Sequence, residues 1–319
     1  MRAKTWSVFV AFCWVIAGLI ALVPAASAQT NCTSFSNVTL ASATTITATP
    51  AYQPFSGSTL TFSFNLTVQN ANNAPCSIAV ILARPTAPLV MNSGGFTLNY
   101  ALDFNGNNVV NIGTPSTGYF LTAPGNGSGT FATYNMTIAA NQTAAAAGNY
   151  ADNQVVLYLY GFRAGDWRLV RTYTLTLGAS INTTCTMSAP SPATLNFTSA
   201  ISQGIPNPGV VLSSSLPGVN CTAPARVTLS GSAMQHTPSV AAVSGFDNFI
   251  NWQATATLGS ATATLATNSQ SSVTSSGYNV PSGTTVGGTV GVDVNLIAGQ
   301  RLQSGTYSGV VTVTVDPTL

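Results

Sequence analysis

Residues 60–69 read L-T-F-S-F-N-L-T-V-Q, and this stretch decides the fold class. Apolar side chains at every second position alternate with Thr, Ser, Asn and Gln. Because successive side chains of a strand point to opposite faces, the alternation predicts one β-strand with a buried face and a solvated face.

The same period of two recurs along the chain, at residues 172–177 (T-Y-T-L-T-L) and 310–315 (V-V-T-V-T-V). Clusters of Gly and Pro separate such runs at short intervals, which is typical of a sandwich or barrel. Residues 254–267 fit either strands or low-complexity sequence, and only residues 139–148 have helical propensity, for a turn or two. The sequence therefore predicts an all-β protein.

Charged residues are scarce: 8 Lys and Arg and 6 Asp among 319 residues, or 4% of the chain. A soluble domain carries about 25%. A nucleic-acid binder needs a basic face, and an acid–base enzyme or metal site needs clustered His, Asp, Glu or Cys. The chain has one histidine, His236, and no Glu. This composition argues against an enzyme, a metal or other cofactor, and nucleic acid as a partner.

The first 28 residues have the form of a secretory signal peptide. Arg2 and Lys4 precede an apolar run, and Ala26-Ser27-Ala28 is an A-x-A cleavage site. The alternative is an uncleaved membrane anchor. Cleavage would leave six Arg and six Asp, and no other apolar run approaches the roughly 20 residues of a membrane span.

Four cysteines follow the signal: Cys32, Cys76, Cys185 and Cys221. An even number in an exported protein indicates two disulfides, and four cysteines allow three connectivities. Proximity in sequence favours Cys32–Cys76 and Cys185–Cys221. A zinc site is the alternative, although the spacings are long for one.

An internal repeat divides the mature chain. Gln142, the G-N-Y at 148–150 and an apolar strand in the first half match Gln300, the G-T-Y at 305–307 and an apolar strand in the second. Together with one cysteine pair per half, the repeat predicts two domains of one kind, at residues 29–178 and 179–319.

The two halves differ after the G-x-Y strand. The first continues through a turn at 161–166 into another alternating strand, 167–177, whereas the second has no such segment. We therefore expect the second sandwich to lack its final strand. Such a sandwich exposes an apolar groove and free edges, which a strand from another chain can fill.

The terminal pattern resembles the spore coat protein U family, which includes the pilins of archaic (Csu-type) chaperone–usher pili. The residues that carry the resemblance are Gly305, Tyr307, Val311, Val313, Val315, Cys185 and Cys221. The resemblance implies immunoglobulin-like sandwiches, of which the second lacks its seventh strand, with Tyr307, Val311, Val313 and Val315 at the edge of a donor-strand groove.

In that family a periplasmic chaperone fills the groove, an outer-membrane usher exports the subunit, and the next pilin supplies the donor strand. Only Gln29, Thr30 and Asn31 would precede Cys32 after cleavage, too few to donate a strand. The expected role is therefore a two-domain tip adhesin at the cell surface, which attaches to an abiotic or host surface and supports biofilm formation.

Apolar residues in three segments of the first half are candidates for the adhesive loops: Leu89, Val90, Met91, Tyr119, Phe120, Leu121, Phe162 and Trp167. The alternative is that these side chains cap the core of the sandwich. At the level of the whole protein, the alternatives are an exported carbohydrate-binding protein and a spore-coat or matrix protein.

Overall fold

A computed structural model of the chain describes residues 29–84, 88–104, 107–108, 120–130, 134–188, 193–268, 273–278 and 284–318. Their regular structure is β apart from one 3-10 turn, η1 (Thr198–Ala200), so the predicted all-β class is confirmed. None of their helices is long and apolar enough to cross a membrane. The predicted signal peptide lies outside these residues.

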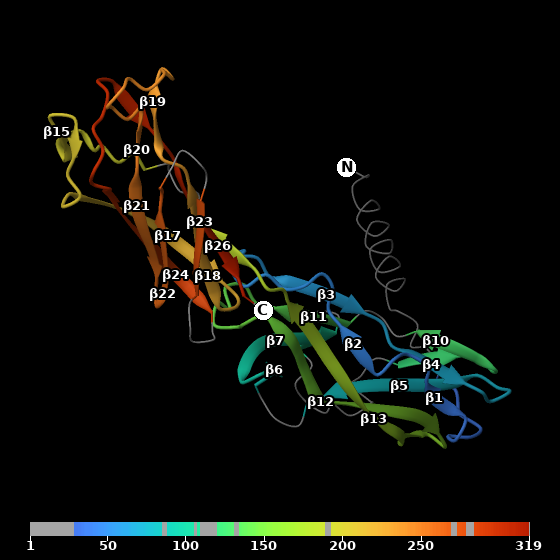
Figure 1. Cartoon of the computed structure of the whole chain (residues 1–319). Helices are drawn as coiled ribbons and strands as arrows, with labels where there is room; N and C mark the ends of the chain where they lie inside the picture. Colours follow the sequence, from blue (N-terminus) through green and yellow to red (C-terminus); the bar gives the residue numbers. More distant parts are fainter. Residues whose placement is uncertain are drawn as a thin grey trace, which may run out of the picture.

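Two immunoglobulin-like sandwiches follow one another along the chain and lie end to end in Figure 1. The strands of the N-terminal sandwich are β1 (Val38–Leu40), β2 (Thr45–Thr47), β3 (Leu60–Phe64), β4 (Thr67–Asn70), β5 (Cys76–Ala83), β6 (Val90–Ser93), β7 (Phe96–Phe104), β8 (Asn107–Asn108), β9 (Phe120–Ala123), β10 (Gly127–Thr130), β11 (Tyr134–Ile138), β12 (Gly148–Arg163) and β13 (Asp166–Ile181).

The strands of the C-terminal sandwich are β14 (Cys185–Met187), β15 (Ile201–Ser202), β16 (Ile205–Pro206), β17 (Val211–Cys221), β18 (Ala225–Gly231), β19 (Met234–Thr237), β20 (Phe249–Ile250), β21 (Trp252–Leu258), β22 (Ala261–Ala266), β23 (Val273–Tyr278), β24 (Thr285–Leu296), β25 (Thr306–Ser308) and β26 (Val311–Pro317). Residues 254–267, which were ambiguous in sequence, form most of the β21–β22 hairpin.

The stretch at 60–69 is two strands rather than one. β3 pairs with β11, whereas β4 pairs with β1 and β10 in another sheet. The chain crosses between sheets at Leu66, whose side chain is fully buried. The alternation is correct, but a continuous period of two cannot reveal a change of sheet, because both strands keep an apolar face toward the same core.

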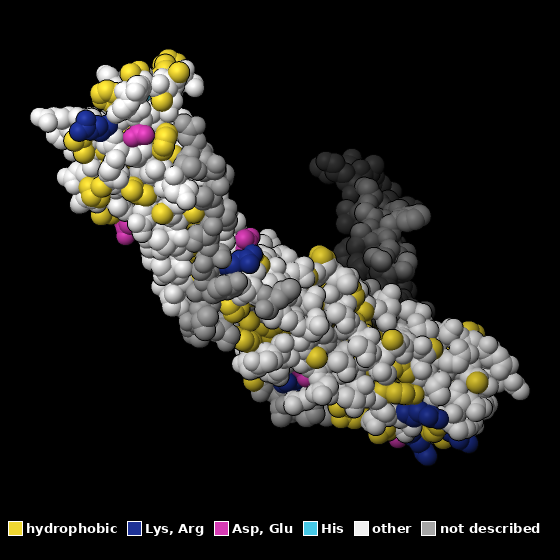
Figure 2. Space-filling view, in the orientation of Figure 1, with side chains coloured by type: hydrophobic (Ala, Val, Ile, Leu, Met, Phe, Trp, Pro, Cys, Tyr) yellow, Lys and Arg dark blue, Asp and Glu magenta, His cyan; other side chains and the backbone are white. Residues whose placement is uncertain are grey.

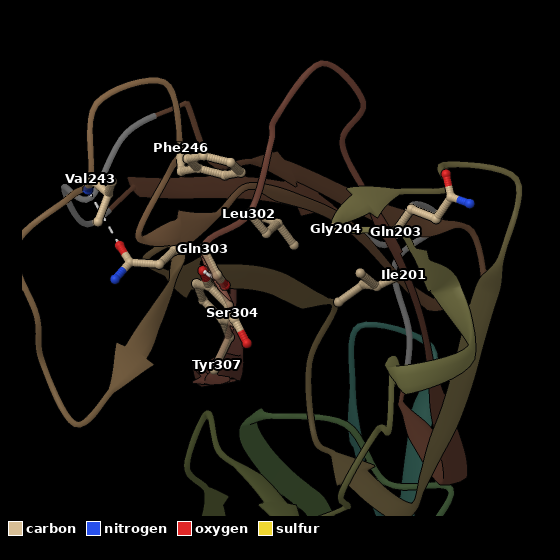
Figure 3. A pocket seen from close by; sticks show the side chains of 10 residues that line it. Ile201, Gln203, Gly204, Val243, Phe246, Leu302, Gln303, Ser304 and Tyr307 are labelled. Atoms are coloured by element: carbon tan, nitrogen blue, oxygen red, sulfur yellow. Dashed lines mark hydrogen bonds between the residues drawn. The ribbon is translucent and has the colours of Figure 1, made fainter.

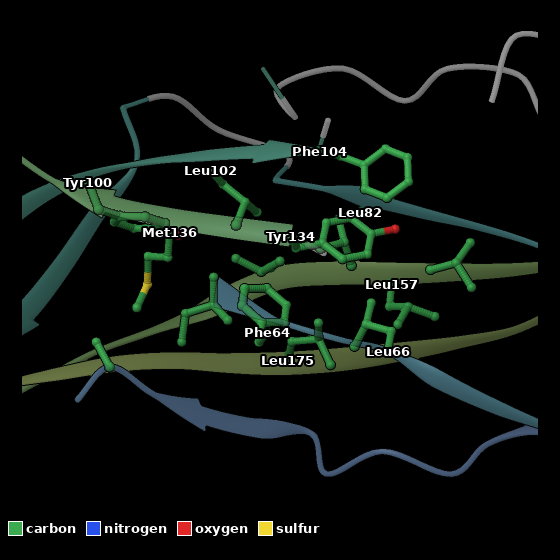
Figure 4. Close-up of a cluster of buried hydrophobic side chains, with 14 of the residues drawn as sticks. Phe64, Leu66, Leu82, Tyr100, Leu102, Phe104, Tyr134, Met136, Leu157 and Leu175 are labelled. Atoms are coloured by element: carbon green, nitrogen blue, oxygen red, sulfur yellow. The ribbon is translucent and has the colours of Figure 1, made fainter. Parts of the chain in front are cut away.

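The core of the N-terminal sandwich lies between these sheets. Figure 4 shows large side chains from β3, β5, β7, β11, β12 and β13 packed together, with the rings of Phe64 and Phe104 on either side of Tyr134. The ring centroids lie 5.6 Å and 4.6 Å from that of Tyr134. Burial raises the pKa of Tyr134, so its hydroxyl stays neutral.

The C-terminal sandwich has two main sheets with strand orders β14-β17-β24-β21-β22 and β23-β18-β26. A separate core that includes Trp252 and Leu229 fills the space between them. On one side of the sandwich β22 packs against β23. The other side is bounded by the sheet edges that β14, β17 and β26 form.

The halves meet through hydrogen bonds of Thr222, one made by its backbone carbonyl and one by its side chain. The amide of Ala147 donates to the carbonyl of Thr222 at 2.7 Å, and the Thr222 hydroxyl donates to the carbonyl of Asn182 at 2.8 Å. Thr222 is fully buried. β13 continues to Ile181, past the boundary predicted at 178, and Ile181 belongs to the N-terminal core.

Both disulfides join the cysteines that sequence proximity favoured, Cys32 to Cys76 and Cys185 to Cys221. The expected helical turns at 139–148 do not form. Ala145 and Ala146 are buried there, and the Ala146 carbonyl accepts a hydrogen bond from the Tyr150 hydroxyl. Packing of Ala145 in the core and the bond from Tyr150 prevail over the local propensity of alanine for helix.

Candidate functional site

Each sandwich contains the same corner at the start of its G-x-Y strand. The Tyr150 hydroxyl donates to the carbonyl of Ala146, and the Tyr307 hydroxyl donates to the carbonyl of Gln303, at 2.7 Å in both cases. Gly148 and Gly305 precede these tyrosines with φ of +155° and +156°. A tyrosine that bonds back to the backbone marks the start of strand F in immunoglobulin-like sandwiches. β12 and β25–β26 therefore occupy the same place in the two halves.

The two matched glutamines of the repeat, Gln142 and Gln300, also make equivalent hydrogen bonds. The Gln142 side-chain oxygen accepts from the amide of Asn99 at 2.6 Å, and that of Gln300 accepts from the amide of Asn251 at 2.7 Å. Each glutamine thus ties the segment before its tyrosine corner to a neighbouring backbone. The internal repeat found in the sequence is present in three dimensions.

The strands after the two corners have different neighbours. β12 pairs along its whole length with β13 and, on its other edge, with β5 and β6. β26 pairs with β18 on one edge, and no described residue pairs with its other edge. We call this second edge of β26 the acceptor edge.

Burial follows the pairing. The inward side chains of β12 at Val155, Leu157 and Leu159 are fully buried, with 0% exposure each. Their counterparts on β26 are Val311, Val313 and Val315, which pack against the core but stay half-buried. The alternation is the same in both strands, so the difference lies in what covers them.

β17 bounds the same side of the C-terminal sandwich in the opposite sheet. β14 pairs only with the end of β17, and residues 211–217 have no strand on that edge among the described residues. Leu212 and Leu216 on this stretch are half-buried against the core. Two unpaired edges with apolar side chains therefore bound one side of the sandwich.

Tyr307, predicted with the valines, is placed differently. It lies on β25, before β26, and lines a pocket of about 590 Å³ at the end of the molecule far from the N-terminal sandwich. Figure 3 shows Phe246, Leu302 and Ile201 around this pocket, and a hydrogen bond from the Val243 amide to Gln303. The Tyr307 hydroxyl also approaches the carbonyl of Asp247 at 3.0 Å, so its role is to hold the corner together.

The adhesive candidates at 89–91 are not a loop at the far end. Met91 is wrong as an adhesive residue, because it has 0% exposure and belongs to the core. Val90 begins β6 and Leu89 packs against the core. The adjoining strand position Asn92 pairs with Ala151, near the junction with the C-terminal sandwich.

Phe120, Phe162 and Trp167 lie at the opposite end, where β12 turns into β13. The Trp167 ring lies 5.6 Å from that of Phe120 and 5.4 Å from that of Phe162. All three rings are half-buried, and Leu169 beside them is 50% exposed. We call Phe120, Phe162, Trp167 and Leu169 the aromatic cluster. Leu121 instead packs against the core, and Tyr119 lies outside the described residues.

One charged network was not foreseen from the sequence. Arg84 and Asp152 form an ion pair, with Nε and Oδ2 2.6 Å apart and with side chains 6% and 1% exposed. The Tyr100 hydroxyl donates to the same carboxylate oxygen at 2.8 Å, and burial followed by this hydrogen bond raises the tyrosine's pKa. The guanidinium also donates to the Pro88 carbonyl, which fixes the chain entering β6. The network links β7 and β12 with the segment between β5 and β6.

Metal-ligating side chains do not gather in the described part of the chain. It contains no set of three or more His, Cys, Asp or Glu placed to hold a metal ion. His236 is half-buried, and its two ring nitrogens lie 2.7 Å and 3.1 Å from the carbonyls of Pro238 and Ser304. Its contacts are those of a residue that joins two loops.

Comparison with known proteins gives matches among solved structures alone. No family model matches the sequence, and no curated protein matches it. A CsuC–CsuE chaperone–tip adhesion subunit complex from Acinetobacter baumannii aligns at 13% identity and a TM-score of 0.40, covering 85% of this chain and 96% of that one. The E. coli adhesin CfaE aligns at 11% identity and a TM-score of 0.30, covering 91% and 80%. The chain is similar to these proteins in its all-β architecture, and its resemblance to the spore coat protein U family is a prediction from sequence.

Proposed function

We propose that this protein is an exported adhesive subunit of a surface fibre, and that its C-terminal sandwich accepts a β-strand from another polypeptide. The observation that carries the proposal is the contrast between β12 and β26. They follow the same tyrosine corner and have the same alternation, but among the described residues β12 has a strand on both edges, whereas β26 has one on a single edge.

Strand addition is the physical remedy for such an edge. An open edge exposes unpaired backbone groups, and three half-buried valines leave part of their apolar surface in water. A strand on the acceptor edge would pair these groups and cover Val311, Val313 and Val315 in one step. The partners that fit are a periplasmic chaperone during export and an adjacent pilin in the fibre, with an outer-membrane usher for secretion.

The adhesive role rests on the other end of the molecule. The aromatic cluster lies at the β12–β13 turn, far from the acceptor edge. The chain carries few charges to desolvate when it lies against a surface, since only 4% of its residues are charged. The proposed orientation therefore places the aromatic cluster outward at a pilus tip and the acceptor edge toward the fibre.

The two disulfides and the N-terminal sequence support export of the protein. Two disulfides are typical of proteins that fold outside the reducing cytosol, and the sequence before Cys32 has the form of a signal peptide. Attachment to an abiotic or host surface, and through it biofilm formation, follows from the adhesive role.

The test supplies the strand artificially. Residues 29–319 are compared with a version that carries, after a flexible Gly/Ser linker, a copy of residues 172–179 (T-Y-T-L-T-L-G-A), a part of β13, which pairs with β12. We expect the copied strand to raise the melting temperature of the C-terminal sandwich by about 5 °C or more, because added apolar burial stabilises a domain of this size by that order.

The matched control carries the same linker and strand with its Tyr and two Leu replaced by Ser. It keeps the backbone donors and loses the apolar side chains, so it should give little of the increase. If both fusions have the same melting temperature as the unmodified chain, the acceptor edge does not bind the added strand and the proposal fails.

A further inference from the structure

Half of the arginines beyond the signal segment lie on one hairpin. The six arginines are at positions 84, 163, 168, 171, 226 and 301, and Arg163, Arg168 and Arg171 belong to β12 and β13. All three side chains are exposed. Figure 2 shows basic side chains gathered at the end of the N-terminal sandwich far from the C-terminal one.

Strand register places the three guanidinium groups on one side of the hairpin. Arg168 pairs with Gly161 and Arg171 pairs with the buried Leu159. Directly paired residues of antiparallel strands point to the same face, and Gly161 faces the ring of Phe35 on the core side. Arg163 lies on that side too, with its guanidinium 5.8 Å from the centre of the Phe35 ring.

The neighbouring residues 34–36 hold two of these groups in place. Phe35 lies under Arg163, and the Ser36 carbonyl accepts a hydrogen bond from Arg171 at 3.2 Å. None of the three arginines forms an ion pair with a described residue. Asp166 is the carboxylate beside these arginines, and its Oδ1 accepts from the Trp167 amide. The other carboxylate of the hairpin, Asp152, is buried in its ion pair with Arg84.

We propose that this side of the hairpin, formed by Arg163, Arg168, Arg171 and residues 34–36, binds an acidic polysaccharide. The arginines extend over about 16 Å of strand, so they can reach carboxylate or sulfate groups on successive sugars. Guanidinium groups bind such anions through paired hydrogen bonds. The hydroxyls of Ser34 and Ser36, 2.8 Å apart, add neutral partners for sugar hydroxyls.

The number and setting of the charges favour a glycan over other anionic polymers. Nucleic-acid binding uses about 6–10 phosphate contacts, and binding to anionic lipid uses about 4–8 basic residues. Only three arginines lie here, and the formal side-chain charge of residues 29–319 is zero, from six Arg and six Asp. Phe35 is covered by Arg163, so this side offers no free ring on which an unpaired base could stack.

The experiment measures binding of the mature chain to immobilised polygalacturonate and to uncharged dextran, at low and at high salt. We expect binding to polygalacturonate alone, weakened by salt, and reduced about tenfold or more when Arg163, Arg168 and Arg171 are all replaced by Gln. Arg301→Gln removes an exposed arginine from the other sandwich and should leave binding unchanged.

Circular dichroism checks that the triple variant is folded. If it is not, Arg168→Gln is used, because its guanidinium has no hydrogen bond in the described structure, and a two- to threefold loss is expected. The proposal is overturned if polygalacturonate does not bind, if the arginine variants bind as the unchanged chain does, or if duplex DNA or anionic vesicles bind as tightly as polygalacturonate. Strand acceptance is not needed for any of these results, so this proposal and the proposed function fail separately.

Discussion

Tyr150 and Tyr307 hold equivalent places in the two sandwiches: each hydroxyl donates to the carbonyl of the residue four positions before it, at 2.7 Å. The two corners identify β12 and β26 as the same strand in two different surroundings. That equivalence makes β12 an internal reference for β26.

Removing either hydroxyl should weaken its own sandwich. Tyr150→Phe and Tyr307→Phe leave the Ala146 and Gln303 carbonyls without that donor, at an expected cost of about 1 kcal/mol each. Urea unfolding followed by tryptophan fluorescence measures the change. Tyr158→Phe removes a half-buried hydroxyl without such a bond and should lie within about 0.5 kcal/mol of the unchanged chain. Equal losses in all three variants would contradict the role given to the corners.

Substitution of Trp167 should reduce adhesion, whereas substitution of Met91 should reduce the stability of the fold. Trp167→Ala removes the ring that contacts both Phe120 and Phe162, so retention on polystyrene should fall at least severalfold while most of the fold's stability is kept. Met91→Ala opens a cavity in the core and should cost about 2–5 kcal/mol, with unchanged retention per folded molecule. If Met91→Ala reduced retention per folded molecule and Trp167→Ala did not, residues 89–91 would be part of the adhesive surface.

The buried pair at Asp152 should matter far more than a surface pair. Asp152→Asn leaves the Arg84 guanidinium buried opposite a neutral amide, which should cost about 3–5 kcal/mol in denaturant unfolding. Asp316→Asn breaks a pair 3.9 Å long in which both side chains are more than 40% exposed, and should cost less than about 1 kcal/mol. Similar costs for the two variants would contradict this ranking.

His236 should make stability depend on pH in one direction. Hydrogen bonding to the Pro238 carbonyl, and then to that of Ser304, raises its pKa above the ordinary 6.5, because both ring nitrogens can donate only when the ring is protonated. A raised pKa gives stability that is complete below pH 6.5 and is lost as pH rises through the folded value. Melting temperatures between pH 5 and 8 should show this fall, and His236→Gln should remove it. If the melting temperature of His236→Gln depended on pH as that of the unchanged chain does, another group would be the cause.

Much of the architecture could be predicted from sequence because alternation and repeats are local signals. The period of two located β3, β4, β13 and β26, and the matched Gln and G-x-Y residues located the two corners. Met91 was misplaced because L-V-M after two prolines reads as an apolar loop. The φ values of Gly94 and Gly95, +53° and +90°, show the tight β6–β7 turn that instead directs Met91 inward.

The charged network could not be read from the sequence. Arg84 and Asp152 lie far apart in the chain, and only the pairing of β5 with β12 brings them together. The change of sheet at Leu66 is hidden for the same reason, since both sides of it alternate alike. Such features depend on which strands become neighbours, and residue spacing does not determine that.

Amide hydrogen exchange of β26, with and without the fused strand, tests the central claim most directly. In an antiparallel strand alternate amides point to opposite edges, so the β26 amides on the acceptor edge should exchange quickly in the unmodified chain and become protected by the fusion. The amides of β12, paired on both edges, should be protected in both proteins. Protection of all β26 amides to the level of β12 without an added strand would show that the acceptor edge is already filled.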